Sequence, residues 1–593
     1  MSDGGSKVAS VLVRHNVAHL FTLCGGHISP ILSGCKKQGI KVIDVRDEAS
    51  AVFAADAVSR ITGIPGVAAV TAGPGVTNTL TAVKNAQLAQ SPLILLGGAS
   101  ATVLRGRGSL QDINQMELIR PHVKYAVTIG KVKDIEPALE KAFEVATSGV
   151  PGPVFVELPI DILYPESIVR EWYGIKGADQ AGGSLGKKAI QLYLDYHTKA
   201  MFKDSDHELT GDSILDSVSK AVGDLTHGAQ TSFKRLSFSK IVGRLLNNAK
   251  KPVMLVGSQS TLAPDRINEL TTAIDQLGVP VYLSGMARGL LGPKHRLQLR
   301  HQRKKALREA DLVILAGVPN DFRLDYGNHI SSRAKLVSIN RCKEDLTRNR
   351  RPTVAIHDDP GSFIEVLAAD VAYDSYKKYL PWLNKLRQQD EERNKEIDVQ
   401  AAVRGTGINP LKLFQKLDTL LPDNSVLVAD GGDFVATAAY TLNPRGPLRW
   451  LDPGVFGTLG VGGGFAAGGA LSHPGSEVWL IYGDGSCAYS LAEFDTFVRH
   501  GIGVIALVGN DASWNQIARD QVEILKDDVG TVLRQTDYHT VAKGYGGEGL
   551  LLRDPAKIVS TIKKAQEIAR TGKPVLINVI LQKSDFRKGS ISV

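Results

Sequence analysis

Residues 481–511 read IYGDGSCAYSLAEFDTFVRHGIGVIALVGND. A short apolar run leads into the turn GDGS (483–486), a helical pattern follows, and a second apolar run ends at Asn510 and Asp511. Short apolar runs bounded by glycine are typical of buried strands. The segment therefore predicts a strand, turn, helix and strand of a parallel α/β sheet.

Two acidic residues of this segment, Asp484 and Asp511, follow the ends of the two predicted strands. Ligands of open parallel sheets bind at the carboxyl ends of strands. Glycines allow close backbone approach, and a helix N-terminus favours phosphate. Carboxylates beside a phosphate need a divalent cation between them. The simpler alternative is an ordinary turn with an N-capping Asp484, which the second carboxylate at the next strand end disfavours.

The same alternation of apolar runs and helical patterns extends over most of the chain. Residues 1–170 contain the expected strands HLFTLCG, IKVIDV, GVAAVTAGPG, PLILLGG and PGPVFVELP. Residues 236–375 contain KPVMLVGS, GVPVYLS, DLVILAG and KLVSIN, and residues 405–593 contain NSVLVADGG, EVWLIYGDG, GVIALVGND and KPVLINVIL. The pattern predicts an α/β protein with three doubly wound parallel-sheet domains.

Two segments connect these blocks. Residues 171–235 are expected to be a linker or insertion, with a flexible GADQAGGSLG stretch and an amphipathic helix KKAIQLYLDYHTKAMF (187–202). That helix is expected to pack against the protein itself, with docking on a partner or a lipid surface as the alternative. Residues 376–404 are rich in charge and are expected to form a linker, as a helix or an irregular segment.

Composition excludes several protein classes. The chain has 593 residues, of which 43% are hydrophobic and 22% charged, so it is neither disordered nor collagen-like. Its four cysteines have no CxxC spacing, which excludes a disulfide scaffold or zinc ribbon and fits a reducing compartment. No run of about 18 uncharged apolar residues suggests a membrane span. The chain by itself therefore reads as soluble and cytoplasmic.

The net charge is +9, but the basic residues are spread along the chain. The one local concentration is RLQLRHQRKKALR (296–308), which is either a solvated helix face or a site for a phosphate-bearing ligand. No nucleic-acid partner is expected.

The GDG…ND pair resembles the cofactor-binding motif of thiamine diphosphate (ThDP)-dependent enzymes. The resemblance implies that Gly483, Asp484, Gly485 and Ser486 bind the diphosphate. It also implies that Mg²⁺ is held by the Asp484 and Asp511 carboxylates and the Ser513 carbonyl. The family usually has Asn where this chain has Asp511, so an additional negative charge is expected there.

Three further motifs resemble this family. In RDEASA, Glu48 alone would suit a helix N-terminus; the resemblance implies that it hydrogen-bonds N1′ of the cofactor and relays a proton. GPGVTN implies cofactor contacts for Pro74 and Asn78. GTLG implies that the Gly457 carbonyl and Leu459 amide hold the aminopyrimidine, while the Leu459 side chain bends the cofactor.

The turn ADGGDF is expected to face the diphosphate through Gly432, Asp433 and Phe434, although acetolactate synthases have Gln-His in place of Asp433 and Phe434. The passages GGHISPIL, GMARGLLG and PRGPLRWLDPGVFGTLGVG resemble 2-hydroxyacyl-CoA lyases more closely than acetolactate synthases. This implies cleavage of a 2-hydroxyacyl-CoA to formyl-CoA and an aldehyde one carbon shorter, a step of fatty acid α-oxidation. An acetolactate-type carboligase is the enzymatic alternative, and a non-catalytic binding protein is a third.

The lyase resemblance assigns further roles. Gln111 in SLQD is expected to orient the substrate hydroxyl, and His27 is the candidate base for its proton. Arg288, Arg323 and the basic stretch 296–308 are candidates for an acyl-CoA site.

The resemblance also implies a homodimer or homotetramer in which Glu48 and Asp484 of different subunits share one cofactor. It further implies location at the endoplasmic reticulum membrane, with peripheral membrane contact as one form of attachment.

Overall fold

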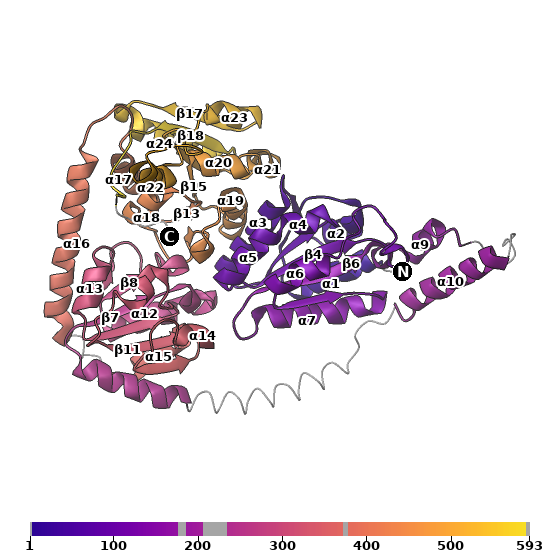
Figure 1. Ribbon diagram of the computed structural model, residues 1–593, viewed down its shortest axis with the longest axis horizontal. Helices are drawn as coiled ribbons and strands as arrows, with labels where there is room; N and C mark the ends of the chain where they lie inside the picture. The colour runs from indigo at the N-terminus through magenta and orange to yellow at the C-terminus, as the bar shows by residue number, and fades with distance from the viewer. Residues whose placement is uncertain (1–2, 176–184, 206–233, 372–376, 589–593) are drawn as a thin grey trace. The chain divides into compact units, whose positions relative to one another are not determined.

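Three parallel sheets organise the chain. The computed structural model describes residues 3–175, 185–205, 234–371 and 377–588. Within these residues each sheet has six strands, and every pair of neighbouring strands is parallel (Figure 1). The chain forms two compact units, of which the first contains the N-terminal sheet and the second contains the other two.

The N-terminal sheet has the order β2-β1-β3-β4-β6-β5. Its strands are β1 (His19–Thr22), β2 (Lys41–Asp44), β3 (Gly66–Val70), β4 (Leu93–Ala99), β5 (Tyr125–Thr128) and β6 (Pro153–Pro159). The main helices around it are α1 (Gly4–Arg14), α2 (Ser29–Lys37), α3 (Glu48–Thr62), α5 (Leu80–Ala89) and α7 (Ile135–Thr147). Their apolar faces bury the strands in one continuous core.

The central sheet has the order β12-β11-β10-β7-β8-β9, the strand order of a Rossmann fold. Its strands are β7 (Pro252–Val256), β8 (Val281–Leu283), β9 (Gln298–Leu299), β10 (Leu312–Ala316), β11 (Lys335–Asn340) and β12 (Val354–His357). Helices α12 (Ile267–Leu277), α13 (Arg303–Glu309) and α15 (Pro360–Asp370) accompany them.

The C-terminal sheet has the order β14-β13-β15-β16-β18-β17, which repeats the topology of the N-terminal sheet. Its strands are β13 (Val426–Ala429), β14 (Trp450–Leu451), β15 (Val478–Gly483), β16 (Val504–Asn510), β17 (Glu548–Leu552) and β18 (Val575–Ile580). The helices that matter for the site are α18 (Asp433–Thr441), α19 (Val461–Ser472), α20 (Asp484–Ser490), α21 (Glu493–His500) and α22 (Asn515–Leu525).

The predicted fold class is confirmed, and every apolar run that was predicted as a strand contains one. Five strands were missed, namely β5, β9, β12, β14 and β17, and all five lie at sheet edges. Edge strands pair on one side only and are short or partly exposed, so they lack the continuous apolar run of a central strand.

The two connecting segments each contain a helix. The predicted amphipathic helix is α10 (Leu185–Phe202), while most of GADQAGGSLG lies outside the described residues. The charged segment forms α16 (Leu380–Ala401), whose Trp382 and Leu386 pack in the central core and whose Ile397 packs near Leu411. One helix thereby joins the two sheets of the second unit. The domain limits drawn from the sequence stay predictions.

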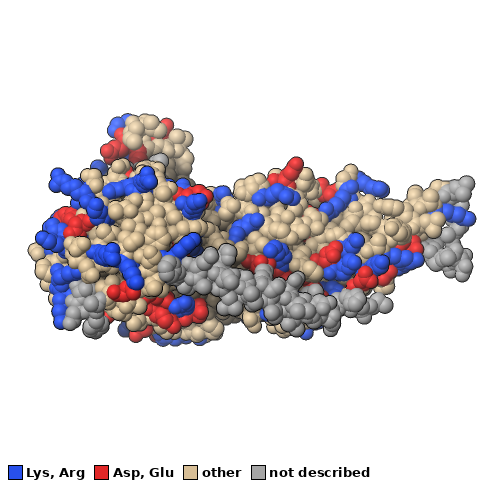
Figure 2. All heavy atoms as spheres, turned by 90° about the horizontal axis from the view of Figure 1, so that it is seen from below, with Lys and Arg blue, Asp and Glu red and all other residues tan. Residues whose placement is uncertain are grey.

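The described residues include no helix with the length and apolar character needed to cross a bilayer. On the face that Figure 2 shows, basic and acidic side chains are interspersed, as expected from the spread of Lys and Arg along the sequence.

Candidate functional site

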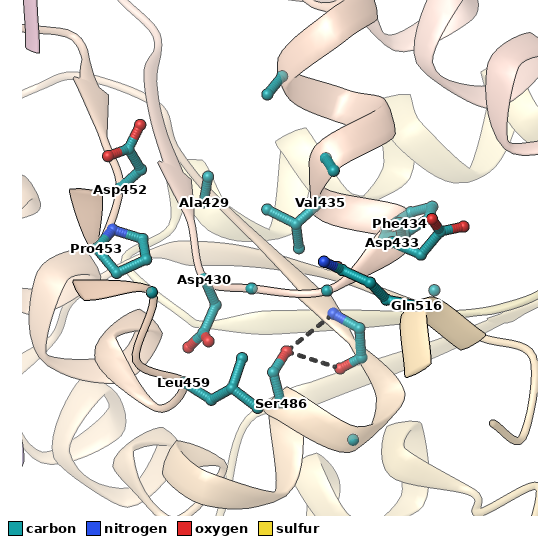
Figure 3. Close-up of a pocket in the computed structure, with 18 of the residues that line it drawn as sticks. Ala429, Asp430, Asp433, Phe434, Val435, Asp452, Pro453, Leu459, Ser486 and Gln516 are labelled. Carbon is teal, nitrogen blue, oxygen red and sulfur yellow. Dashed lines mark hydrogen bonds between the residues drawn. The ribbon is translucent and has the colours of Figure 1, made fainter. Parts of the chain in front are cut away.

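The second unit contains a cavity of about 560 Å³ at the carboxyl ends of β13, β14, β15 and β16 (Figure 3). All the cofactor and metal residues predicted in this part of the chain line it: Gly432, Asp433, Phe434, Gly457, Leu459, Gly483, Asp484, Gly485, Ser486, Asp511 and Ser513. The structure thus brings together residues that lie up to 81 positions apart in the sequence, from Gly432 to Ser513. Their roles as ligands stay predictions.

The turn between β15 and α20 is built for close approach of a ligand. The Ser486 hydroxyl accepts the Gly483 N–H at 3.0 Å and donates to the Gly483 carbonyl at 3.2 Å, which fixes the turn (Figure 3). A Cβ on Gly485 would lie 2.4 Å from the Trp514 ring, so only glycine fits.

The Asp484 and Asp511 carboxylates are close enough to influence one another. Burial raises the pKa of Asp484 to about 6. Burial, together with the negative charges of Asp484 and Asp433, raises the pKa of Asp511 to about 7. Hydrogen bonds from the Gly485 and Ser513 amides oppose this shift at Asp484. Two buried like charges are unfavourable unless a cation lies between them.

These carboxylates fit Mg²⁺, which prefers oxygen ligands and keeps several sites for water or substrate phosphate. Among the described residues no three His, Cys, Asp or Glu side chains group as metal ligands. Two carboxylates therefore leave the remaining positions to backbone oxygen, water and the diphosphate, which suits a metal that bridges protein and phosphate.

Asp433 does not add an unpaired charge to the cavity. Its carboxylate accepts the Arg519 guanidinium at 2.6 Å and the Asn515 amide at 3.2 Å. Arg519 also donates to the Arg587 carbonyl, which ties the C-terminal segment to this turn. The neighbouring Phe434 ring packs on Gly509, where a Cβ would lie 2.4 Å away.

Asp430 was not predicted as a site residue, yet it organises the cavity. It is buried at the end of β13 and accepts the amides of Gly460 at 3.1 Å and Gly462 at 2.7 Å. Burial raises its pKa to about 7. The signal in the sequence was a carboxylate directly after a fully apolar strand.

The turn that carries Leu459 has a glycine with positive φ before it and another after it. Gly457 and Gly460 have φ values of 65° and 88°, which favour glycine. The Leu459 side chain leans on Gly431, where a Cβ would come within 2.3 Å, and it points into the same space as Asp430 and Ser486 (Figure 3). This geometry suits a side chain that would press on a bound cofactor.

The first unit carries the other group of predicted residues. Glu48 begins α3 and is 8% exposed. Asp47 takes over the capping role, because its side chain accepts the Ala49 N–H at 2.7 Å. The Glu48 carboxylate instead accepts the Asn78 amide at 3.1 Å. Asn78 ends the short helix α4 (Pro74–Asn78), so Glu48 faces the GPGVTN turn. The roles of these residues toward the cofactor stay predictions.

His27 follows β1 and Gln111 follows β4, so both lie beyond the carboxyl ends of strands in the N-terminal sheet. His27 Nδ1 lies 3.1 Å from the Thr71 hydroxyl, and partial burial lowers the pKa of His27, so the neutral ring is favoured. The Gln111 backbone lies against Gly73, where a Cβ would be 2.9 Å from its carbonyl oxygen.

Gln115 is a second residue that the sequence prediction missed. Its buried amide accepts the Gly73 N–H at 3.2 Å and donates to the Gly98 carbonyl at 2.8 Å. It thereby ties the turn after β3 to strand β4. No spacing or charge signal marked this residue.

The basic candidates differ from one another. Arg288 lines the cavity, stacks over Trp450 at 5.2 Å and donates to the Ala439 carbonyl at 2.8 Å. Arg323 also lines it but is paired with Asp321.

The basic stretch 296–308 is mixed. Arg296 pairs with Asp275, whereas Arg300 is buried and donates only to backbone carbonyls and Asn443. Neither a single solvated face nor a single phosphate site therefore describes the stretch.

Comparison with known families agrees with this geometry. Residues 2–118 match the family model "Thiamine pyrophosphate enzyme, N-terminal TPP binding domain", residues 240–367 match the "central domain", and residues 430–579 match the "C-terminal TPP binding domain". The chain belongs to the thiamine pyrophosphate enzymes. Thiamine pyrophosphate is another name for ThDP, so the predictions of family, ThDP cofactor and enzymatic nature are confirmed.

Individual relatives are similar over nearly their whole length. A protein named 2-hydroxyacyl-CoA lyase 2 from Danio rerio is 49% identical, covering 100% of this chain and 93% of the relative. The human protein of the same name is 46% identical, covering 100% and 92%. A probable acetolactate synthase from Mycobacterium bovis is 30% identical, covering 98% and 96%. The predicted lyase class agrees with the names of the first two.

Proposed function

We propose that this enzyme is a ThDP- and Mg²⁺-dependent lyase that cleaves a 2-hydroxyacyl-CoA into formyl-CoA and an aldehyde one carbon shorter, as in fatty acid α-oxidation. The observation that carries the proposal is the single cavity that gathers the paired carboxylates, the glycine turns and Arg288. The 2-hydroxyacyl-CoA lyase 2 relatives at 46–49% identity support the choice of substrate.

The second unit would anchor the cofactor. Asp484, Asp511 and the Ser513 carbonyl would hold Mg²⁺, and the turn 483–486 would hold the diphosphate. Gly457 and Leu459 would fix the aminopyrimidine. ThDP, when bound, supplies the nucleophilic carbon and the electron sink for breaking the C1–C2 bond.

The first unit would handle protons. Glu48 would exchange a proton with N1′ of the aminopyrimidine, and the hydrogen bond from Asn78 fixes the direction of its carboxylate. His27, which is mostly neutral at physiological pH because of its lowered pKa, would accept the proton of the substrate 2-hydroxyl. Gln111 would orient that hydroxyl. The leaving aldehyde needs this deprotonation, because its C=O forms as the C–C bond breaks.

A second cavity of about 400 Å³ is suited to the anionic part of coenzyme A. It shares Arg288 with the first cavity and is also lined by Arg300, Arg303, Lys304 and His329. None of its described lining residues is acidic. Burial, together with the positive charge of Arg288, lowers the pKa of Arg303. Arg288 and Arg303 donate to backbone carbonyls rather than to carboxylates. Guanidinium groups without a bonded carboxylate are suited to phosphate.

The proposal includes a homodimer or homotetramer in which Glu48 of one subunit and Asp484 of another serve one cofactor. It also includes peripheral attachment to the endoplasmic reticulum membrane. An acetolactate-type carboligase is the competing function, supported by the relative at 30% identity. The pairing of Asp433 with Arg519 disfavours it, since the acetolactate synthases have Gln-His in place of Asp433 and Phe434.

A direct assay separates the two functions. Purified enzyme with ThDP and Mg²⁺ is given 2-hydroxyacyl-CoAs of graded chain length, or pyruvate, and formyl-CoA, aldehyde and acetolactate are measured. We expect formyl-CoA and aldehyde in equal amounts and no acetolactate. Acetolactate formation without cleavage of any 2-hydroxyacyl-CoA would refute the lyase proposal.

A further inference from the structure

Helix α10 presents apolar side chains on two opposite sides, and the fold uses only one. On the inner side Thr198 and Met201 are buried against the first unit. His197 also belongs to this side, and its Nε2 lies 2.7 Å from the Thr102 hydroxyl, which itself donates to the buried Asp161 at 2.6 Å. These contacts fix the rotation of the helix about its axis.

The outer side is an aromatic and aliphatic stripe that the described residues leave open. Leu192, Tyr193 and Tyr196 are 71%, 56% and 74% exposed, and Ile190 at the start of the stripe is 60% exposed. Residues three or four positions apart are neighbours on a helix surface, which connects these four side chains into one stripe. A contiguous exposed stripe of large apolar side chains marks an interaction surface, unlike single exposed residues.

Lysines border the stripe at both ends. Lys187 and Lys188 precede it, Lys199 and Lys203 follow it, and all four are exposed. The one acidic residue of α10, Asp195, is paired with Arg170 and Lys199. The positive charge left around the stripe therefore comes from Lys187, Lys188 and Lys203.

The adjacent helix α9 (Glu166–Trp172) adds to this end of the first unit. It packs beside α10 (Figure 1), and its Trp172 is 48% exposed. Tryptophan and tyrosine are the residues enriched where a membrane meets water, because their rings are apolar and their polar atoms stay hydrated.

We propose that the outer face of α10 (Ile190, Leu192, Tyr193 and Tyr196, with its flanking lysines) docks on the surface of a bilayer that contains anionic lipid. The helix would lie in the plane of the interface, with the stripe among the acyl chains and the lysines among the headgroups. A second copy of this chain fits less well, because a two-fold contact would place the same lysines against each other.

The attachment is tested by co-sedimentation of the holoenzyme with vesicles of phosphatidylcholine alone or mixed with phosphatidylserine. We expect binding to the mixed vesicles at low salt, weakening as salt is raised. Leu192→Ser with Tyr196→Ser should lower the vesicle partition coefficient at least tenfold. Lys187→Glu with Lys188→Glu should reduce binding to mixed vesicles only. Val399→Ser, at an equally exposed position on α16, is the matched control and should bind like wild type.

Two results would overturn the proposal. One is that the wild-type enzyme fails to bind mixed vesicles at low salt, or that the Leu192/Tyr196 variant binds as the wild type does. The other is that this variant, at equal concentration, changes the oligomeric mass measured by light scattering, which would make the face a contact between copies. Cleavage activity in detergent-free solution should be equal in all variants, so failure here leaves the proposed lyase function untouched.

Discussion

The N-terminal and C-terminal sheets have the same strand order and carry different chemistry. In the first, the turn after β2 presents the buried carboxylate of Glu48, which is bonded to the Asn78 amide. In the second, burial raises the pKa of Asp484 to about 6, and burial together with the charges of Asp484 and Asp433 raises the pKa of Asp511 to about 7. The shared topology sets where the turns meet, and the turn residues decide whether a domain moves a proton or anchors a charge.

Equivalent turns make the contrast specific. Glu48 follows β2, and the Gly457–Leu459 turn follows the corresponding strand β14. Gln111 follows β4, and Asp511 follows the corresponding strand β16. If this division is right, substitutions in the first sheet should damage turnover, and substitutions in the second should damage cofactor affinity.

The largest effect is expected from Glu48→Gln. An amide cannot relay a proton, so turnover should fall by roughly 10²–10⁴-fold. The dissociation constant of ThDP, measured by calorimetry, should change far less. Asp47→Asn, which alters only a capping carboxylate, is the control. Turnover within a few-fold of wild type would remove Glu48 from the chemistry.

Asp484→Asn should show the reverse pattern, with a loss of cofactor affinity and little loss of turnover. It removes a metal-binding charge, and we expect the affinity for Mg²⁺ with ThDP to fall by at least about 10–100-fold, the range for residues that only support a metal ligand. Turnover at saturating cofactor should largely recover. Asp495→Asn, which alters a half-buried carboxylate on α21 that is paired with Arg499, is the matched control. An unchanged metal affinity would contradict the division between the two sheets.

Asp511→Asn should have a smaller effect. The amide oxygen can still bind a metal, and the substitution relieves the repulsion with Asp484 and Asp433. We expect a change of only a few-fold in cofactor affinity, measured by titration of Mg²⁺ at fixed ThDP. A loss as large as that in Asp484→Asn would show that both carboxylates are needed as charges.

The smallest effect concerns Asp430, whose pKa is about 7 in the folded protein against about 3.9 in an unfolded chain. The folded state therefore holds a proton that the unfolded state has released between about pH 4 and pH 7, so stability falls as the pH rises through that window. In Asp430→Asn this contribution is absent. Between pH 4 and pH 7, the Tm of the cofactor-free variant should decline by about 2–4 °C less than the Tm of the cofactor-free wild type. Parallel Tm curves from pH 4 to pH 8 would contradict the assignment.

The sequence predicted most of the fold because buried parallel strands have a recognisable sequence pattern. Runs such as PLILLGG and GVIALVGND are apolar throughout, since both faces of a parallel strand are covered. The strands β9 and β14 have two residues each and gave no such run. The same holds for functional residues, because charged or glycine-rich turns were found. Gln115 acts through a backbone amide that no local pattern reveals, whereas Asp430 was missed although it directly follows a fully apolar strand.

The sequence alone determined the fold class, the three α/β blocks and the residue types at each strand end, because periodicity and turn chemistry are local properties. Only the tertiary structure decided that the turns from Gly432 to Ser513 line one cavity and that the pKa values of Asp484 and Asp511 are raised. It also decided that α10 leaves a second apolar face exposed. Burial and through-space charge depend on which segments meet, and this is set by packing rather than by neighbours in the chain.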